Sequence, residues 1–282
     1  MVRISWPALR LQLPVTDRTA LTNLIWAALD DLAPTAVDDE SERSGWLTIH
    51  FGLEEARARA AVRFRGEMAG LGVSVTEFDI GDDGWAERSQ AELKAVSVGR
   101  LTVRPPWDCQ VREPDTVVIE PSMGFGTGHH ATTRLCLAAL QRLPLAGLTL
   151  ADVGTGSGIL AIASVLLGAS KAVAIDTDVD ALECARKNAQ LNRVGDRVTF
   201  LSSDLRTFAG PATDVVVANL TGSLLRTAAR KLVRLVRPEG HLILSGLLAT
   251  EEADVAEAFQ SMAEAAWRDE EDGWVGLLLR RL

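Results

Sequence analysis

Residues 148–167 read LTLADVGTGSGILAIASVLL, and this stretch decides the fold of the second half of the chain. Its apolar start predicts a buried strand with Asp152 near its end, and its apolar end predicts a helix. Between them, Gly154 and Gly156 permit positive φ and a close approach of the backbone to a ligand, while the start of the helix presents free N–H groups. The spacing GxGxG differs from the GxGxxG that suits a dinucleotide pyrophosphate. The stretch therefore predicts a ligand-binding loop between a strand and a helix.

Polar residues stand at the ends of the next three predicted strands. Asp176 follows the strand over residues 171–175 and is placed to accept hydrogen bonds from both ribose hydroxyls of an adenosine, with Asp178 as a competitor for that role. Asp204 ends the third strand and is a candidate for adenine recognition, the alternative being an ordinary turn or cap residue. Asn219 follows the fourth strand. Open α/β sheets bind ligands at the carboxyl ends of their strands, so these positions predict one shared site.

Helices alternate with these strands along the second half of the chain. A further strand over residues 240–246, a helix and a final strand pair complete the pattern. Alternation of this kind favours a mostly parallel sheet with helices on its faces. We therefore predict an α/β domain over residues 95–282.

The first eighty residues predict a smaller domain of their own. Their apolar patterns indicate strand, helix, strand, strand, helix and strand, the order of ferredoxin-like α+β domains. The strands are expected over residues 3–13, 35–38, 45–52 and 73–80, and the helices over 17–32 and 53–71. The polar residues 81–94 predict a linker, after which residues 95–104 return to strand character.

The same layout occurs in RNA-recognition modules, which need basic and aromatic residues on their central strands. Residues 45–52 offer only Trp46, His50 and Phe51, without lysine or arginine, and residues 1–80 carry eight basic and twelve acidic side chains, a net charge of −4. We interpret these residues as core and surface of a small sheet. The alternative is an acidic face that docks a basic protein.

Composition narrows the class of protein further. The 282 residues have a net charge of −9, which argues against a nucleic-acid binder that works by general electrostatics. Three isolated cysteines, at 109, 136 and 184, indicate neither a disulfide framework nor a zinc site. His129 and His130 are adjacent without an acidic cluster, so no metal is expected. The sequence contains no candidate membrane span or signal peptide, which predicts a soluble, cytoplasmic protein.

Longer motifs connect the chain to a known family. The combination DxGxGxG, an acidic end of the second strand and a polar end of the fourth resembles class I S-adenosylmethionine-dependent methyltransferases, which have a Rossmann-like seven-stranded domain. The segments VRPPW (103–107), VIEPSMGFGTGHHATT (118–133), DVGTGSGILAIA (152–163) and ANL (218–220) resemble the bacterial ribosomal protein methyltransferase A family. Members of that family methylate amino groups of the eleventh protein of the large ribosomal subunit. The likeness is best over residues 95–265, while the first domain agrees mainly in layout with the substrate-binding domain of the family.

The resemblance implies a set of site residues. Contacts to the donor S-adenosylmethionine, whose product is S-adenosylhomocysteine, fall on Thr133, Gly154, Asp176 and Asn219. The segment over residues 125–130 would form a loop over the donor. The complete set that we expect to bind the donor is Phe125, Gly126, Thr133, Gly154, Gly156, Asp176, Asp204 and Asn219.

The expected chemistry is transfer of a methyl group to an unprotonated amine. A lysine amine with a pKa near 10.4 is neutral in roughly one molecule in a few thousand at pH 7, while an α-amino group needs less help. Asn219 offers a carbonyl that can accept an amine hydrogen bond, so we expect it to act in catalysis. The sequence ANLTG (218–222) lacks the Asn-Pro-Pro-aromatic segment that grips a planar amide or base.

The predicted function is therefore methylation of lysine or N-terminal amino groups of the eleventh large-subunit ribosomal protein, free in solution, without a membrane or direct nucleic-acid contact. The first domain would recognise this substrate. Alternatives are a methyltransferase of another protein or of a small-molecule amine, an NAD-dependent oxidoreductase, and a non-catalytic RNA-binding protein.

Overall fold

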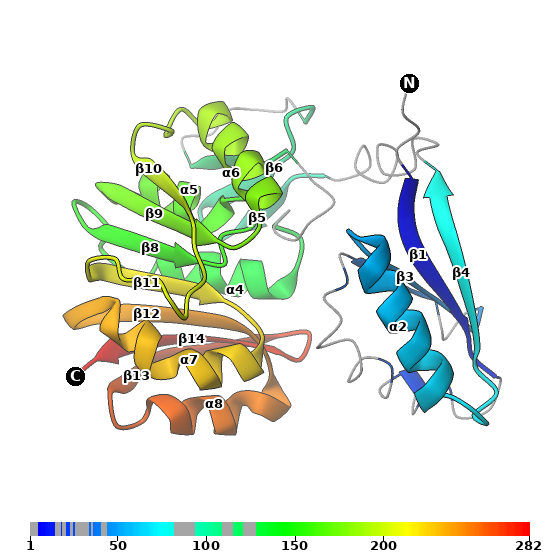
Figure 1. Ribbon diagram of the computed structural model, residues 1–282. Coiled ribbons are helices and arrows are strands. Elements are labelled where there is room, and N and C mark those ends of the chain that lie inside the picture. Colours follow the sequence, from blue (N-terminus) through cyan, green and yellow to red (C-terminus); the bar gives the residue numbers. More distant parts are fainter. Residues whose placement is uncertain are drawn as a thin grey trace. The chain divides into compact units, whose positions relative to one another are not determined.

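The computed structural model describes residues 5–14, 18, 21–22, 25, 34, 36–40, 44–81, 94–108, 115–120 and 128–282. The chain divides into two compact units, Met1–Glu92 and Leu93–Leu282 (Figure 1). Most of the predicted linker lies outside the described residues. Within the described part of the chain, none of the helices has the length and apolar character needed to cross a membrane.

The first unit contains a four-stranded antiparallel sheet in the order β2-β3-β1-β4. Its strands are β1 (Ser5–Gln12), β2 (Ala36–Glu40), β3 (Trp46–His50) and β4 (Ser74–Gly81). The first strand lies between the third and the fourth, which is compatible with the predicted ferredoxin-like layout. Of the helix predicted over residues 17–32, only residues 18, 21, 22 and 25 are described, and all four are helical.

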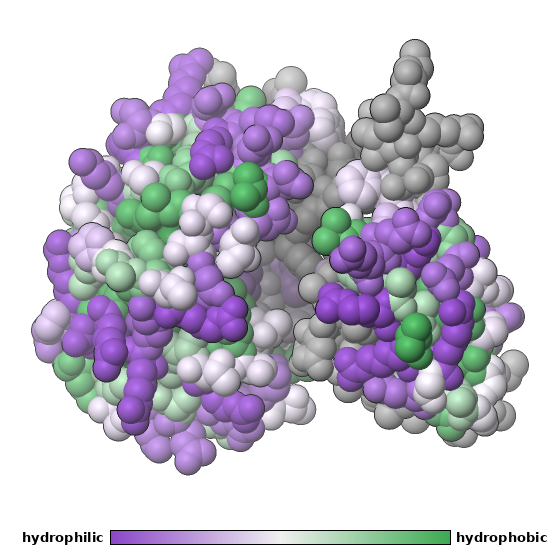
Figure 2. All heavy atoms as spheres, viewed as in Figure 1, coloured by the Kyte–Doolittle hydropathy of each residue, from purple (hydrophilic) through white to green (hydrophobic). Residues whose placement is uncertain are grey.

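Helix α2 (Glu54–Glu67) packs on this sheet through Ala60, Ala61 and Phe64, which are fully buried. Its outward positions are mostly charged, which accounts for the hydrophilic surface over this helix in Figure 2. The helix ends at residue 67 and not at 71 as predicted, because the chain turns at Gly70 and Gly72, both with positive φ.

The packing of β3 bears on the RNA-binding alternative. Phe51 is fully buried and His50 is 3% exposed, so neither ring can stack on a base. Trp46 is half-buried, with the Arg10 guanidinium 5.7 Å from its ring centroid. These contacts favour the interpretation of residues 45–52 as part of a packed sheet.

The second unit begins with a small three-stranded sheet of β5 (Val96–Val98), β6 (Leu101–Arg104) and β7 (Thr116–Val118). The strand character predicted over residues 95–104 is confirmed, but it is divided between two strands, because the chain turns at Gly99 (φ +57°) and β5 pairs antiparallel with β6. The Gln141 side chain holds this turn by accepting from the Arg100 N–H and donating to the Val98 carbonyl. The apolar pattern alone does not reveal a turn that a distant side chain stabilises.

The main sheet of the second unit has seven strands in the order β10-β9-β8-β11-β12-β14-β13. The strands are β8 (Thr149–Val153), β9 (Lys171–Asp176), β10 (Val198–Ser202), β11 (Thr213–Asn219), β12 (Val236–Leu248), β13 (Ala263–Glu271) and β14 (Trp274–Arg281). The first five in spatial order are parallel, and β14 runs antiparallel to both its neighbours. The predicted seven-stranded Rossmann-like fold is confirmed.

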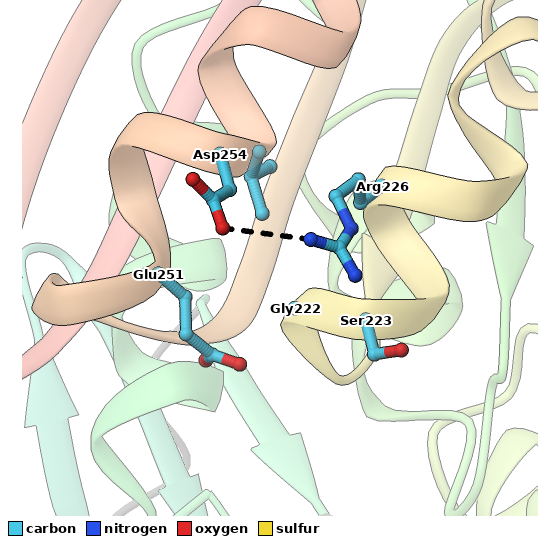
Figure 3. A pocket seen from close by; sticks show the side chains of 6 residues that line it. Gly222, Ser223, Arg226, Glu251 and Asp254 are labelled. Carbon is cyan, nitrogen blue, oxygen red and sulfur yellow. Dashed lines mark hydrogen bonds and ion pairs between the residues drawn. The ribbon is translucent and has the colours of Figure 1, made fainter.

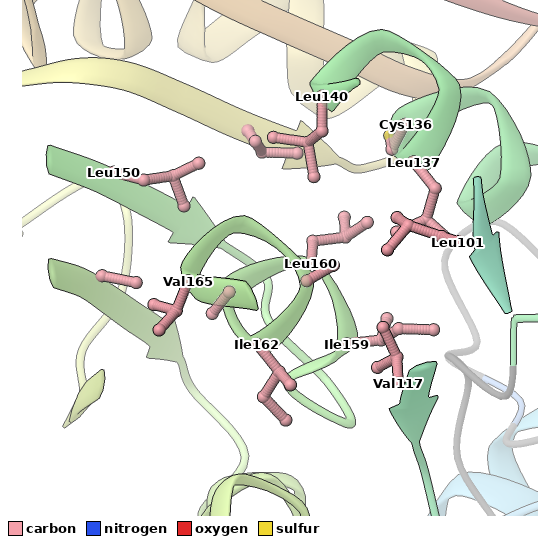
Figure 4. Packing of buried hydrophobic residues seen from close by; sticks show 14 of the residues in the cluster. Leu101, Val117, Cys136, Leu137, Leu140, Leu150, Ile159, Leu160, Ile162 and Val165 are labelled. Atoms are coloured by element: carbon pink, nitrogen blue, oxygen red, sulfur yellow. The ribbon is translucent and has the colours of Figure 1, made fainter. Parts of the chain in front are cut away.

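Helices cover both faces of this sheet (Figure 1). They are α4 (Ala131–Leu140), α5 (Ile159–Leu166), α6 (Val179–Leu191), α7 (Gly222–Arg234) and α8 (Glu252–Phe259). In β11, Val215 and Val217 pack with α4 and α5 in the core shown in Figure 4, while Val216 and Ala218 pack with α7 and α8. Burial on both faces explains why this strand is apolar throughout.

Candidate functional site

The carboxyl ends of β8, β9 and β11 meet at the point where the strand order reverses. The chain passes from β8 outward to β9 and β10 on one side, and then returns to β11 on the other side of β8. Such switch points are where open α/β sheets bind ligands. The glycine loop after β8, Asp176 at the end of β9 and Asn219 at the end of β11 therefore share one edge of the sheet.

The glycine loop has the backbone conformation that its composition predicts. Gly154, Gly156 and Gly158 have φ values of +72°, +51° and +82°, which L side chains rarely adopt. The Gly154 and Thr155 N–H groups donate to the Ile175 carbonyl at 2.8 and 3.0 Å, so the loop is bound to the end of β9. A Cβ on Gly154 would lie 2.6 Å from Leu220, which follows β11. The positive φ therefore favours glycine at these positions, and a Cβ at residue 154 would in addition displace the Leu220 side chain.

The structure distinguishes between Asp176 and Asp178, the two candidates for binding the ribose hydroxyls. Asp178 caps α6, accepting from the Asp180 N–H at 2.9 Å, and it is exposed. Asp176 is half-buried, and its two oxygens accept from the N–H groups of Gly156 at 2.9 Å and of Asp178 at 3.1 Å. A carboxylate accepts about four hydrogen bonds, so Asp176 retains capacity for a ligand beside the glycine loop.

Asp152 lies beneath the loop and is fully buried. Its Oδ2 accepts from the Thr155 hydroxyl at 2.7 Å and from the Ala161 N–H at 3.1 Å, whereas its Oδ1 has no partner among the described residues. Burial raises the pKa of this carboxyl to about 6, with a smaller contribution from the charge of Asp176. Asp152 therefore links the glycine loop to the start of α5, and the pKa of its carboxyl is unusually high.

Asp204 follows β10 and is already engaged by Arg206. Its carboxylate accepts from the Arg206 backbone N–H at 2.8 Å and from the Arg206 guanidinium, and these bonds lower the pKa of Asp204 to about 2. The Thr207 and Phe208 N–H groups donate to its carbonyl. This geometry is that of a turn residue, the alternative left open by the sequence, and recognition of adenine by Asp204 stays a prediction.

Asn219 is linked to the first turn of α4 by a chain of hydrogen bonds. Its Nδ2 donates to the Thr132 hydroxyl at 3.2 Å, and that oxygen is 2.8 Å from Nδ1 of His130, the N-cap of α4. Burial and the charge of Arg134 lower the pKa of His130, which favours a neutral ring, and Nδ1 of this ring accepts from the Thr132 backbone N–H at 3.4 Å. The Thr132 hydroxyl then donates its one proton to His130, so its oxygen accepts from Asn219 Nδ2. The Asn219 amide consequently directs its oxygen, and not its nitrogen, away from Thr132.

The remaining predicted residues fall partly outside the described chain. Thr133 lies in the first turn of α4 and is 3% exposed. Phe125 and Gly126 lie outside the described residues. Gly128 has a φ of +85°, and a Cβ there would lie 2.7 Å from Val103.

The adjacent histidines have different partners. His129 Nε2 is 2.9 Å from the Lys94 carbonyl, whereas His130 contacts Thr132 and forms a T-shaped pair with the Trp274 ring. In the described part of the chain, no group of three or more histidine, cysteine, aspartate or glutamate side chains is arranged to hold a metal ion.

The sequence patterns did not single out two residues of this site, Thr132 and Asn188. Asn188 in α6 is fully buried and binds the carbonyl of Ser157 in the glycine loop at 2.9 Å. A buried asparagine in an amphipathic helix is the signal that could have marked it, since polar groups in a core need partners.

A separate small pocket lies between α7 and α8 (Figure 3). It is lined by Gly222, Ser223, Arg226, Glu251, Asp254 and Val255, and an Arg226–Asp254 ion pair of 3.5 Å crosses it. A Cβ on Gly222 would lie 2.8 Å from the Glu251 carboxylate. The pocket contains none of the residues predicted to bind the donor. The candidate site therefore lies at the strand ends and not in this pocket.

The seven-stranded sheet with its antiparallel end, and a glycine loop at the switch point, define a class I methyltransferase domain. The profile of the family described as "Ribosomal protein L11 methyltransferase (PrmA)" matches residues 38–282. The chain belongs to this family.

Individual relatives agree with that assignment. The ribosomal protein L11 methyltransferase of Geobacter sp. (strain M21) is 35% identical over 272 residues, covering 90% of this chain and 87% of the relative. That of Azotobacter vinelandii (strain DJ / ATCC BAA-1303) is 43% identical over 202 residues, covering 70% and 68%. The crystal structure of a ribosomal protein L11 methylase from Lactobacillus delbrueckii subsp. bulgaricus has a TM-score of 0.61 at 28% identity, covering 67% of this chain and 98% of that one.

Proposed function

We propose that this protein transfers methyl groups from S-adenosylmethionine to amino groups of ribosomal protein L11, on lysine side chains or at the N-terminus. Membership of the family supports the methyltransferase activity and the substrate. The observation that carries the choice of an amine is the orientation of Asn219, whose Nδ2 is held by Thr132 so that its oxygen can accept from an N–H group.

The residues at the strand ends fit the donor. Asp176 is half-buried beside the glycine loop with unused acceptor capacity, which suits two ribose hydroxyls. The buried Oδ1 of Asp152, without a partner among the described residues, indicates a further polar group or water nearby. The donor-binding set that we propose is Phe125, Gly126, Thr133, Gly154, Gly156, Asp176, Asp204 and Asn219. S-adenosylmethionine supplies the methyl group and its leaving group when bound.

The protein then has to align an unprotonated amine. Asn219 would accept one hydrogen bond from this amine through Oδ1 without holding a charge, which orients the nitrogen lone pair toward the methyl group. Desolvation at the carboxyl edge of the sheet would lower the pKa of a lysine amine. His130 supports Asn219 through Thr132, and its lowered pKa disfavours a positive charge on this ring.

We further propose that the first unit selects the substrate and that L11 is methylated as the free protein in the cytoplasm. Every described side chain of the donor set belongs to the second unit, which leaves the sheet of the first unit for recognition. Buried His50 and Phe51 speak against base stacking by that sheet.

The test is methylation of purified L11 by the full chain and S-adenosylmethionine, followed by mass spectrometry of the L11 peptides. We expect methylated lysine or N-terminal peptides with the wild type, and a rate at least tenfold lower with Asn219→Ala. Calorimetric titration with S-adenosylmethionine and NADH separates the methyltransferase from the oxidoreductase. Donor binding without any modification of L11 would assign the enzyme to another protein or a small-molecule amine.

A further inference from the structure

The buried side chain of Asn188 joins two parts of the chain that are distant in sequence. Its Nδ2 donates to the Ser157 carbonyl at 2.9 Å, and its Oδ1 accepts from the Glu120 N–H at 2.8 Å. The side chain has no exposure to solvent. Reversing the amide would break both bonds and leave buried groups unsatisfied, so only one orientation is stable.

Two asparagines, Asn188 in α6 and Asn192 at its C-cap, form hydrogen bonds with the backbone at the end of β7, as a neighbouring strand would. The Val118 N–H and carbonyl bind the side chain of Asn192 at 2.8 and 2.6 Å, and the Glu120 N–H binds Asn188. Four helical residues rise about 6.0 Å and two strand residues about 6.6 Å. Asparagines one helical turn apart therefore match alternate residues of an extended chain.

Ser157 depends on such a partner because of its place in the glycine loop. Gly156 and Gly158 flank it with positive φ and have no side chains with which to pack. The Gly156 N–H donates to Asp176, the residue assigned to the donor ribose. A shift of the Ser157 carbonyl would therefore also move the N–H group that orients the Asp176 carboxylate.

We propose that Asn188 is a positioning residue of the donor site, which sets donor affinity by fixing the glycine loop against the chain at Glu120. The inference rests on the donor site of the proposed function, and it deepens it. Asn192 offers a matched control, because its bonds are with Val118 and with the Asn188 carbonyl.

The first experiment compares Asn188→Ala and Asn192→Ala in the full chain by calorimetric titration with S-adenosylmethionine, with the melting temperature and L11 kinetics measured alongside. Both variants should melt earlier than the wild type. We expect Asn188→Ala to bind the donor at least tenfold more weakly, with kcat at saturating donor reduced less than threefold. Asn192→Ala should keep the donor affinity within twofold.

A second variant keeps the test decisive if Asn188→Ala does not fold. Asn188→Asp retains an acceptor for Glu120 and can donate to Ser157 only when it is protonated, and burial raises the pKa of a carboxyl. We expect its donor affinity at pH 6 to exceed that at pH 8 by fivefold or more relative to the wild type. A structural role alone would not produce this difference.

Equal donor affinity in Asn188→Ala and wild type, or equal losses in both alanine variants, would overturn the inference. So would an affinity of Asn188→Asp that follows the wild type from pH 6 to pH 8. A wild type that binds the donor but does not methylate L11 refutes the proposed substrate alone, since the donor titrations still decide the role of Asn188.

Discussion

Asp176 is the single residue on which we expect donor binding to depend most. Replacement by alanine removes a carboxylate that would accept two ribose hydrogen bonds, each worth about 1.5–3 kcal/mol when one partner is charged. We expect Asp176→Ala to weaken S-adenosylmethionine binding at least tenfold in calorimetry.

The neighbouring carboxylate provides the control. Asp178→Ala removes the cap of α6 and should lower the free energy of unfolding by about 1 kcal/mol. Its donor affinity should remain within twofold of the wild type. A larger loss with Asp178→Ala than with Asp176→Ala would move the ribose contact to Asp178.

Asp152 gives a pH dependence that can be measured by stability alone. Its pKa in the folded protein, about 6, lies above the ordinary value of 3.8, so the fold binds this proton more tightly than the unfolded chain does. The associated stability is fully present below pH 3.8 and is lost as the pH rises through 6. Between pH 7 and pH 4.5 the wild type should therefore gain about 2 kcal/mol from this group.

Asp152→Asn cannot take part in that titration, while other groups titrate alike in both proteins. Urea unfolding at the two pH values should show the free energy of unfolding of the wild type rising by about 2 kcal/mol relative to the variant on acidification. A difference between the two proteins that does not change with pH would show that Asp152 has an ordinary pKa.

At the scale of elements, the contact between the start of α4 and the end of β11 orients Asn219. Thr132→Val has nearly the shape of threonine but lacks the hydroxyl that accepts from Nδ2, so the Asn219 amide loses its fixed orientation. We expect kcat for L11 methylation to fall at least tenfold, with donor affinity within threefold of the wild type. Steady-state kinetics and calorimetry measure the two quantities.

Thr132→Ser preserves the hydroxyl and should retain at least a third of the wild-type kcat. If valine and serine reduce kcat equally, the loss comes from packing at this buried position and not from the hydrogen bond to Asn219.

At the scale of the whole molecule, the two units have separate hydrophobic cores. The core of the first unit is formed within residues 9–75, and the two clusters of the second within residues 96–279. A fragment beginning at Leu93 keeps the Lys94 carbonyl that contacts His129. We expect this fragment to bind S-adenosylmethionine with near-native affinity and to lose most activity on L11.

The fragment and the full chain should be assayed together on purified L11, with circular dichroism and donor titration as controls for folding. If the fragment methylates L11 as fast as the full chain does, the first unit does not select the substrate.

Sequence patterns alone were sufficient to predict the main sheet and the sheet edge that the glycine loop, Asp176 and Asn219 share. Apolar runs predicted the parallel strands, and the glycines at 154, 156 and 158 predicted a loop that does adopt positive φ. These features depend on neighbours in the chain or on a general rule of α/β sheets, so they can be derived without coordinates. The hairpin at Gly99 could not be derived in this way, because its turn is held by Gln141, which lies 41 residues from Arg100 at the C-cap of α4.

Only the tertiary structure decided how the polar groups of the site are used. It assigned Asp178 to the cap of α6, engaged Asp204 with Arg206, and joined His130, Thr132 and Asn219 into one chain. It also placed the Asn188 amide between Ser157 and Glu120. The physical reason is that a hydrogen bond requires its two atoms to lie within about 3 Å with the correct orientation, and packing of distant elements sets that geometry.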